Sequence, residues 1–186
     1  MKKSYSGLAI IASLSLLLAS CATPVKEAEL IPLGEENFKS TGKSIVIEPI
    51  TLAGRPQPGL MDSAGFTFPE AKAYDFAITN TLSKSDMSTE VKTEGVADYT
   101  LTTNVVGERM LGTTSNVVFI LVRYKLVETS TRNILWEENI FSHYDLSVDE
   151  EFIGATRIGK VLEGAIRENM NLLDDRLAEV LNAQGT

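Results

Sequence analysis

The sequence contains one cysteine, one histidine and one tryptophan in 186 residues, and each shortage excludes a kind of chemistry. A lone cysteine, Cys21, cannot form a disulfide within the chain. With only His143 beside it, an ordinary zinc cluster of histidine and cysteine ligands is excluded. The acidic runs Asp149-Glu150-Glu151 and Asp174-Asp175 lack the spacing of a calcium loop. We therefore expect no metal and no cofactor, and we interpret Asp174-Asp175 as a solvated surface.

The sequence also lacks an apolar run long enough to span a bilayer. Its longest run, Gly7 to Ala19, has 13 residues, whereas a spanning helix needs about 20. Lys2 and Lys3 precede this run and Leu-Ala-Ser-Cys, residues 18–21, closes it. A basic start, a short apolar centre and small residues at the end are typical of a secretory signal. An ordinary cleaved signal followed by a free cysteine is the alternative.

This pattern resembles a bacterial lipoprotein signal peptide with its lipobox. The resemblance implies that residues 1–20 are removed and that Cys21 becomes an acylated first residue carrying palmitate or similar chains. Several acyl chains give stable anchoring in a lipid bilayer. The next residue is Ala22, whereas enterobacterial lipoproteins kept at the inner membrane have aspartate there. The resemblance therefore implies a lipid anchor in the outer membrane, with the domain in the periplasm.

Basic side chains are scarce in what remains. Without residues 1–20, the chain has 15 lysines and arginines against 25 acids, a formal charge of −10. Such a balance disfavours polyanions, so we expect no nucleic acid as a partner. We interpret residues 21–42, which mix Pro, Gly and Glu without periodicity, as a flexible tether. Residues 43–186 are then one domain, long enough for a core of its own.

Hydrophobic periodicity predicts seven elements in this domain. Val, Ile and Thr runs and strict alternation predict strands, whereas apolar residues three and four apart predict helices. The predicted strands are 44–50, 87–93, 98–109, 116–128 and 134–145, and the predicted helices are 68–84 and 151–182. Short polar links join the last three strands, which predicts an antiparallel meander. The fold class is therefore α+β: a two-layer domain with a mixed, largely antiparallel sheet of about five strands and two helices, the longer one C-terminal.

Local signals predict the ends and the packing of the helices. Thr67 and Glu70 have the spacing of a capping box at the first helix, and Ser147 and Glu150 have it ahead of the second. The apolar stripe of the long helix is interrupted by Gly159 and Gly164, which lower helix propensity. We expect these glycines to allow a close approach to the sheet, or to kink the helix.

No motif supports catalysis. Residues 40–44 end like a phosphate-binding loop, but Asn37 stands where that motif needs glycine, and a strand follows where it needs a helix. Asp62-Ser63-Ala64-Gly65 resembles a nucleophile elbow, but it has Met61 in place of the first glycine. His143 lies within a strand, facing away from Ile140 and Tyr144. We therefore expect that the protein is not an enzyme.

The long segment 53–68 is the main candidate for a partner-binding site. It is longer than most connections in a compact domain and carries Leu60, Met61, Phe66 and Phe68. Either these side chains fold over the sheet as a lid, or they form a contact surface for a partner. Trp136 is expected to be a partly buried sheet residue, with a binding anchor as the alternative.

Three short segments resemble small envelope lipoproteins: Ala97-Asp98-Tyr99-Thr100-Leu101, Arg123 to Glu128, and Asn133-Ile134-Leu135-Trp136-Glu137. They are similar to penicillin-binding-protein activator lipoproteins and related TolB-amino-terminal-like domains. Residues 163–169 are similar to uncharacterised proteobacterial lipoproteins, and the general style resembles auxiliary lipoproteins of lipid-transporting ABC systems. The resemblance implies a non-catalytic lipoprotein that binds another envelope protein as adaptor, activator or assembly factor. The alternative is an auxiliary component of lipid or glycolipid transport, with an apolar groove walled by residues 117–122.

Overall fold

The computed structural model describes residues 42–53, 69–85, 90–92, 94–111, 116–147, 149–150 and 154–184. In chain order the elements are β1 (Ser44–Ile47), α2 (Ala71–Lys84), β2 (Glu90–Lys92), β3 (Tyr99–Leu111), β4 (Asn116–Glu128), β5 (Ile134–Leu146) and α3 (Gly154–Gln184). The expected signal peptide and all of the expected tether except Gly42 lie outside the described residues.

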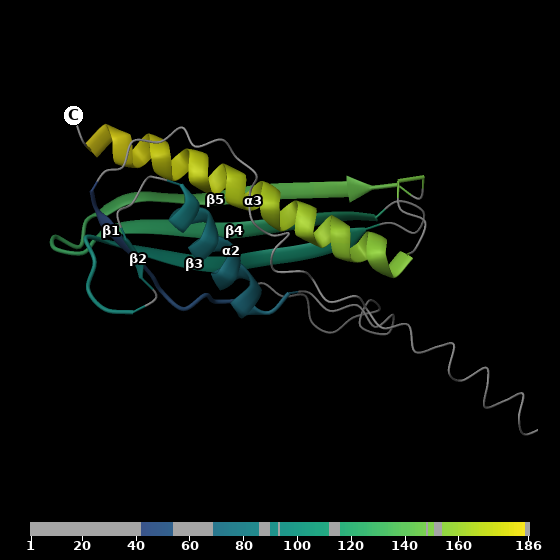
Figure 1. The fold of residues 1–186 in the computed structure, drawn as a ribbon, viewed down its shortest axis with the longest axis horizontal. Helices are drawn as coiled ribbons and strands as arrows, with labels where there is room; N and C mark the ends of the chain where they lie inside the picture. Colours follow the sequence, from purple (N-terminus) through teal and green to yellow (C-terminus); the bar gives the residue numbers. More distant parts are fainter. Residues whose placement is uncertain are drawn as a thin grey trace, which may run out of the picture.

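One five-stranded sheet carries the domain, in the order β2-β1-β3-β4-β5. β1 is parallel to both of its neighbours, and β3, β4 and β5 form the predicted antiparallel meander. Helix α2 connects β1 to β2, as a parallel pair requires a crossover rather than a tight turn. Both helices lie on the same face of the sheet, with α3 running diagonally across it (Figure 1). The predicted α+β two-layer fold is confirmed.

The core lies between this face and the two helices. Inward side chains alternate along β3 and β4, and the apolar stripes of α2 and α3 cover them. Among the most deeply buried residues are Ile45, Tyr74, Ile78, Leu101, Ile120, Tyr124, Leu162 and Ile166. Burial of large apolar side chains is the main favourable contribution to folding, at about 1.5–3 kcal/mol for each.

The apolar run 117–122 is divided between the two faces of the sheet. Val118, Ile120 and Val122 are fully buried against the helices, in one hydrophobic cluster with the apolar stripe of α3. Val117, Phe119 and Leu121 lie on the opposite face because successive side chains in a strand alternate. In the described part of the chain the expected groove between sheet and C-terminal helix is therefore occupied by packed side chains.

The start of α2 differs from the sequence-based prediction. α2 begins at Ala71 with Glu70 as N-cap and without a side-chain capping bond, and Thr67 lies outside the described residues. α3 is described from Gly154, and residues 151–153, where the sequence predicts its start, lie outside the described residues. The Ser147 backbone N–H donates to Glu150 Oε2 at 2.8 Å, so this pair closes a turn ahead of the helix. That hydrogen bond lowers the pKa of Glu150.

Gly164 marks the close approach of α3 to β5 that the sequence predicted. A Cβ atom built there would lie 2.4 Å from the nearest carbons of the Tyr144 ring. Any larger residue would therefore force the ring or the helix to move. Gly159 is buried as well.

A polar network that the sequence did not predict crosses the core between α3 and the sheet. The Tyr124 hydroxyl donates to Asn169 Oδ1 at 2.7 Å. Asn169 Nδ2 donates to Ile140 O at 3.2 Å and to Ser142 Oγ at 3.1 Å. The Ser142 hydroxyl donates to Ala165 O at 3.0 Å. Because buried polar groups must be paired, the network fixes how α3 sits on β4 and β5.

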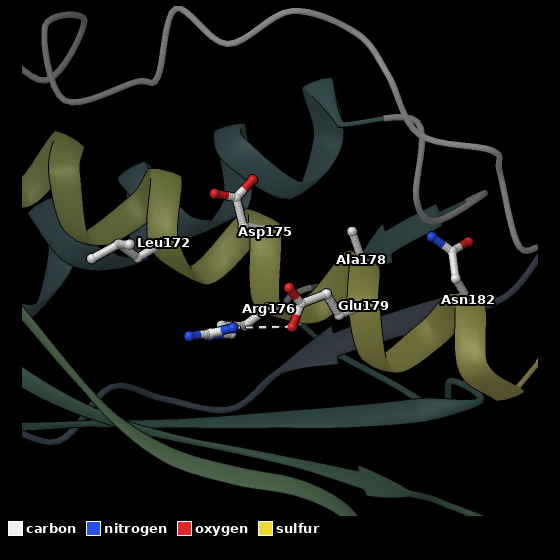
Figure 2. A pocket seen from close by; sticks show the side chains of 6 residues that line it. All are labelled: Leu172, Asp175, Arg176, Ala178, Glu179 and Asn182. Atoms are coloured by element: carbon white, nitrogen blue, oxygen red, sulfur yellow. Dashed lines mark hydrogen bonds and ion pairs between the residues drawn. The ribbon is translucent and has the colours of Figure 1, made fainter.

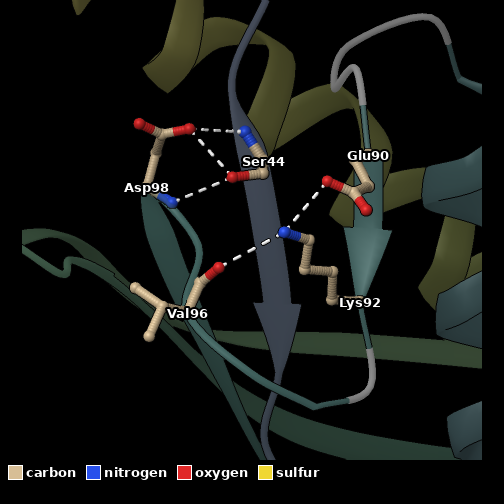
Figure 3. Close-up of polar contacts among 5 residues, drawn as sticks. All are labelled: Ser44, Glu90, Lys92, Val96 and Asp98. Atoms are coloured by element: carbon tan, nitrogen blue, oxygen red, sulfur yellow. Dashed lines mark hydrogen bonds and ion pairs between the residues drawn. The ribbon is translucent and has the colours of Figure 1, made fainter.

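The segment Ala97-Asp98-Tyr99 has a structural role at the start of β3 (Figure 3). The Asp98 carboxylate accepts hydrogen bonds from Ser44 N at 2.8 Å and Ser44 Oγ at 2.9 Å, joining β1 to β3 across 54 residues. Lys92 Nζ pairs with Glu90 at 2.9 Å and donates to Val96 O at 3.3 Å, holding the link from β2 to β3. The Ser44 N–H is the largest cause of the lowered pKa of Asp98.

Candidate partner-binding surface

The face of the sheet opposite the helices, which we call the open face, carries the outward side chains of β3, β4 and β5. No helix of the described part packs on it, since the helix-facing residues of these strands are the alternate ones. The strand register places these residues in rows across the sheet: Gly107–Leu121–Phe141, then Arg109–Phe119–His143, then Leu111–Val117–Asp145. One end of the open face is therefore rich in large apolar side chains.

Three rings form a cluster on this end. Phe119 lies opposite His143, and Phe141 is two residues before His143 on the same side of β5. The ring centroids are 5.9 Å apart for Phe119–Phe141 and 6.1 Å apart for each of the other two pairs. The ring planes differ by only 22–23°, within the range of favourable aromatic contacts. Yet 54% of Phe141 is exposed, so the aromatic cluster is a surface feature.

Arginines stand at both ends of this cluster. Exposed Arg109 lies opposite Phe119, and exposed Arg123 lies two residues beyond Leu121 on β4. Arg123 Nε donates to Asn139 Oδ1 at 3.0 Å. Neither arginine forms an ion pair with a residue in the described part of the chain. The whole chain has a formal charge of −8. Two arginines without an ion pair in the described part therefore make the surface beside the exposed rings locally positive.

Gly107 makes a shallow gap between the two arginines. The register of β3 against β4 shifts between Val105 and Gly107, so an irregularity precedes it. A Cβ atom added at Gly107 would meet nothing within 4 Å. The open face therefore has a gap beside Leu121, midway between Arg109 and Arg123 along the strands.

The site residues expected from the sequence cannot be placed on this surface. Cys21, Leu60, Met61, Phe66 and Phe68 all lie outside the described residues, so lipidation and the lid-or-surface alternative for the segment 53–68 stay predictions. The alternation pattern contained a signal for the aromatic cluster, since Phe119 and Phe141 occupy outward positions. Only the cross-strand register brings them together.

Trp136 is the partly buried sheet residue that the sequence predicted. Its ring stacks on Tyr124 with centroids 6.3 Å apart and planes 12° apart. Its Nε1 donates to Glu138 Oε2 at 3.1 Å. Trp136 thus packs on the helix side of the sheet rather than on the open face.

His143 and the acidic runs are the remaining candidates from the sequence. His143 is exposed on the open face, turned away from Ile140 as expected. No group of three or more His, Cys, Asp or Glu side chains able to hold a metal is found among the described residues. The solvated-surface interpretation is wrong for Asp174: partial burial raises its pKa to about 6, and its Oδ1 atom is buried without a hydrogen-bond partner in the described part of the chain. Asp175 is exposed.

Two surface pockets of about 400 Å³ each are alternative candidate ligand sites. The first lies on α3 (Figure 2), where Arg176 is already neutralised by Glu179 at 3.0 Å and by Glu138 at 3.6 Å. The second lies around Ser44 and Asp98, whose polar groups bond to each other. In each pocket the polar groups just named are already paired within the chain, so the open face remains the stronger candidate.

The fold and this surface define a class: a small two-layer α+β domain with an aromatic, arginine-bearing open sheet face. No family model matches the sequence, and no curated protein matches it either. Solved structures do resemble it. A protein from Xanthomonas campestris of the family DUF330 has a TM-score of 0.63 at 11% identity, over 83% of this chain and 96% of that one.

A second similar structure is a putative neuraminyllactose-binding hemagglutinin homolog from Helicobacter pylori. It has a TM-score of 0.50 at 12% identity, over 83% of this chain and 95% of that one. A putative lipoprotein from Caulobacter crescentus reaches a TM-score of only 0.40, at 14% identity over 49% of this chain and 72% of that one, and adds no argument. At these identities the comparisons show a shared fold. They do not show the expected resemblance to activator lipoproteins or TolB-like domains.

Among the described helices, none is long and apolar enough to cross a membrane.

Proposed function

We propose that the protein is a non-catalytic envelope lipoprotein, anchored in the outer membrane through acylated Cys21. Its periplasmic domain binds another envelope protein and acts as adaptor, activator or assembly factor. The observation that carries this proposal is the open face, where Phe141 and its neighbours expose stacked rings beside two arginines that form no ion pair within the described part of the chain. Contiguous exposed apolar side chains, with aromatic residues and arginine among them, are typical of protein interaction sites.

The lipid-transport alternative has less support. It required an apolar groove between the sheet and α3, and buried side chains fill that interface in the described part of the chain. The apolar surface lies instead on the opposite face, as an exposed platform rather than an enclosed channel.

The anchor is tested by two substitutions at the predicted processing site. Cys21→Ser is expected to abolish metabolic labelling with palmitate and the recovery of a mature form in membranes. Ala22→Asp is expected to leave palmitate labelling intact but to move the protein toward inner-membrane fractions in an enterobacterial host. Equal palmitate labelling of wild type and Cys21→Ser would refute the lipid anchor.

Partner binding is tested by site-specific photo-crosslinking in living cells. A p-benzoylphenylalanine residue replaces Phe141 on the open face or, as a control, exposed Asp175 on α3. We expect a discrete adduct with one envelope protein from position 141 and none from position 175. Absence of any protein adduct at 141, or the same adduct at both positions, would contradict the proposal.

A further inference from the structure

We infer that the open face recognises an extended segment of the partner protein in which two carboxylates flank a large apolar side chain. This inference rests on the proposed function and specifies the chemistry of the partner. The apolar side chain would lie on the aromatic cluster, and the carboxylates would pair with Arg109 and Arg123. Carboxylates are the groups that a guanidinium binds best, through two parallel hydrogen bonds.

The spacing of the two arginines sets the spacing of the carboxylates. Arg109 lies opposite Phe119, and Arg123 is four residues further along the neighbouring strand. At about 3.3 Å per residue and 4.8 Å between strands, their Cα atoms are about 14 Å apart. An extended chain covers that distance in four residues, with the side chain midway between them on the same side. The matching pattern is therefore acid–x–apolar–x–acid.

The apolar centre of the site is built between these charges. Gly107 and Leu121 lie at the level midway between the arginines, with Phe119 and Phe141 beside Leu121. Because nothing stands within 4 Å of the Cβ position of Gly107, a side chain from a partner has room there. Burial of the exposed rings under a large apolar side chain of the partner contributes to the binding free energy. The two arginines fix the alignment of the partner segment and select for its carboxylates.

Charge favours a protein segment over an anionic lipid surface as the occupant. The predicted mature chain has a formal charge of −10 and is repelled as a whole by a field of anionic headgroups. A short acidic segment instead meets Arg109 and Arg123 within the roughly 8 Å over which charges act at physiological ionic strength. Glu137 and Asp145, which also lie on the open face, stand outside the span between the two arginines.

The test uses the photo-crosslinker at position 141 in the full chain in cells. Arg109→Glu/Arg123→Glu is expected to reduce the adduct about tenfold or more, because two attractive charge pairs become repulsive. Gly107→Leu is expected to reduce it as well, since the new side chain starts in open space and occupies the gap. Arg132→Glu, which makes the same charge change as either of the two arginine substitutions alone, lies in the exposed β4–β5 turn. It is the control, compared with Arg109→Glu and Arg123→Glu as single variants, and is expected to leave the adduct unchanged.

Mass spectrometry of the adduct then identifies the crosslinked segment. Exchanging its two acids for lysine is expected to abolish the adduct with the wild type and to restore it with Arg109→Glu/Arg123→Glu. An unchanged adduct with the double variant would overturn this inference while leaving partner binding intact. An adduct with a second copy of this chain or with lipid alone would also overturn it. Absence of any adduct in the wild type would instead reject the proposed function. Urea unfolding midpoints of each variant separate loss of binding from loss of fold.

Discussion

The buried network around Asn169 offers the sharpest test of the packing argument. Asn169 is fully buried, and it makes three hydrogen bonds, one from Tyr124 and two to β5. Asn169→Leu keeps a similar volume but removes all three. At a net contribution of about 1 kcal/mol for each bond, with a further cost for the Tyr124 hydroxyl left buried without its acceptor, we expect a loss of about 3–4 kcal/mol.

A double-mutant cycle separates the network from simple packing. Tyr124→Phe alone removes one donor and is expected to cost about 1–2 kcal/mol. Tyr124→Phe/Asn169→Leu is expected to cost no more than Asn169→Leu alone, because the double variant leaves no stranded hydroxyl. The two substitutions should therefore couple by about 1 kcal/mol or more.

The assay is urea unfolding of the mature domain followed by the fluorescence of Trp136. This residue is the single tryptophan of the chain and stacks on Tyr124, so its emission reports on the relevant interface. Far-ultraviolet circular dichroism provides a second probe for two-state behaviour. A cost below about 1 kcal/mol for Asn169→Leu, or strict additivity in the cycle, would refute the claim that this network positions α3.

Three further predictions concern single positions. Gly164→Ala is expected to cost about 1–3 kcal/mol because its Cβ would overlap the Tyr144 ring, and less in a Tyr144→Ala background, as measured by urea midpoints. The pKa of Asp174 is raised to about 6, above its usual 3.8, so its protonated form stabilises the fold below about pH 4 and this contribution is lost as pH rises through 6. Asp174→Asn should therefore stabilise the protein at pH 7 by about 1 kcal/mol, a value reduced for partial exposure, and have little effect at pH 4; a constant effect across this range would contradict the assignment. The pKa of Asp98 is lowered, so Asp98→Ala should lower the urea midpoint at pH 7, and the midpoints of variant and wild type should converge as pH falls through the folded-state pKa.

The aromatic cluster illustrates what sequence reasoning could not reach. Phe119 and Phe141 are 22 residues apart, and alternation alone says only that each faces one side of a strand. Whether they meet depends on the β4–β5 register, which shifts between Leu126 and Val127. A slip of one residue would turn one of them to the other face. The prediction of a partner site at Leu60, Met61, Phe66 and Phe68 rested on the length and composition of the segment 53–68, which contain no information about strand register.

The sequence by itself determined the order and type of the elements, the meander and the apolar stripes, because period 2 and period 3.6 are local properties of the chain. It also determined the lipoprotein signal pattern at Cys21 and the scarcity of catalytic groups. Only the tertiary structure decided which polar residues are buried. Asn169 and Tyr124, for example, pair across 45 residues of sequence, and no local pattern predicts that contact. The tertiary structure likewise decided that the run 117–122 is split between core and surface and that Arg109, Arg123 and the rings share one face. These are relations between strands, set by register and by helix placement.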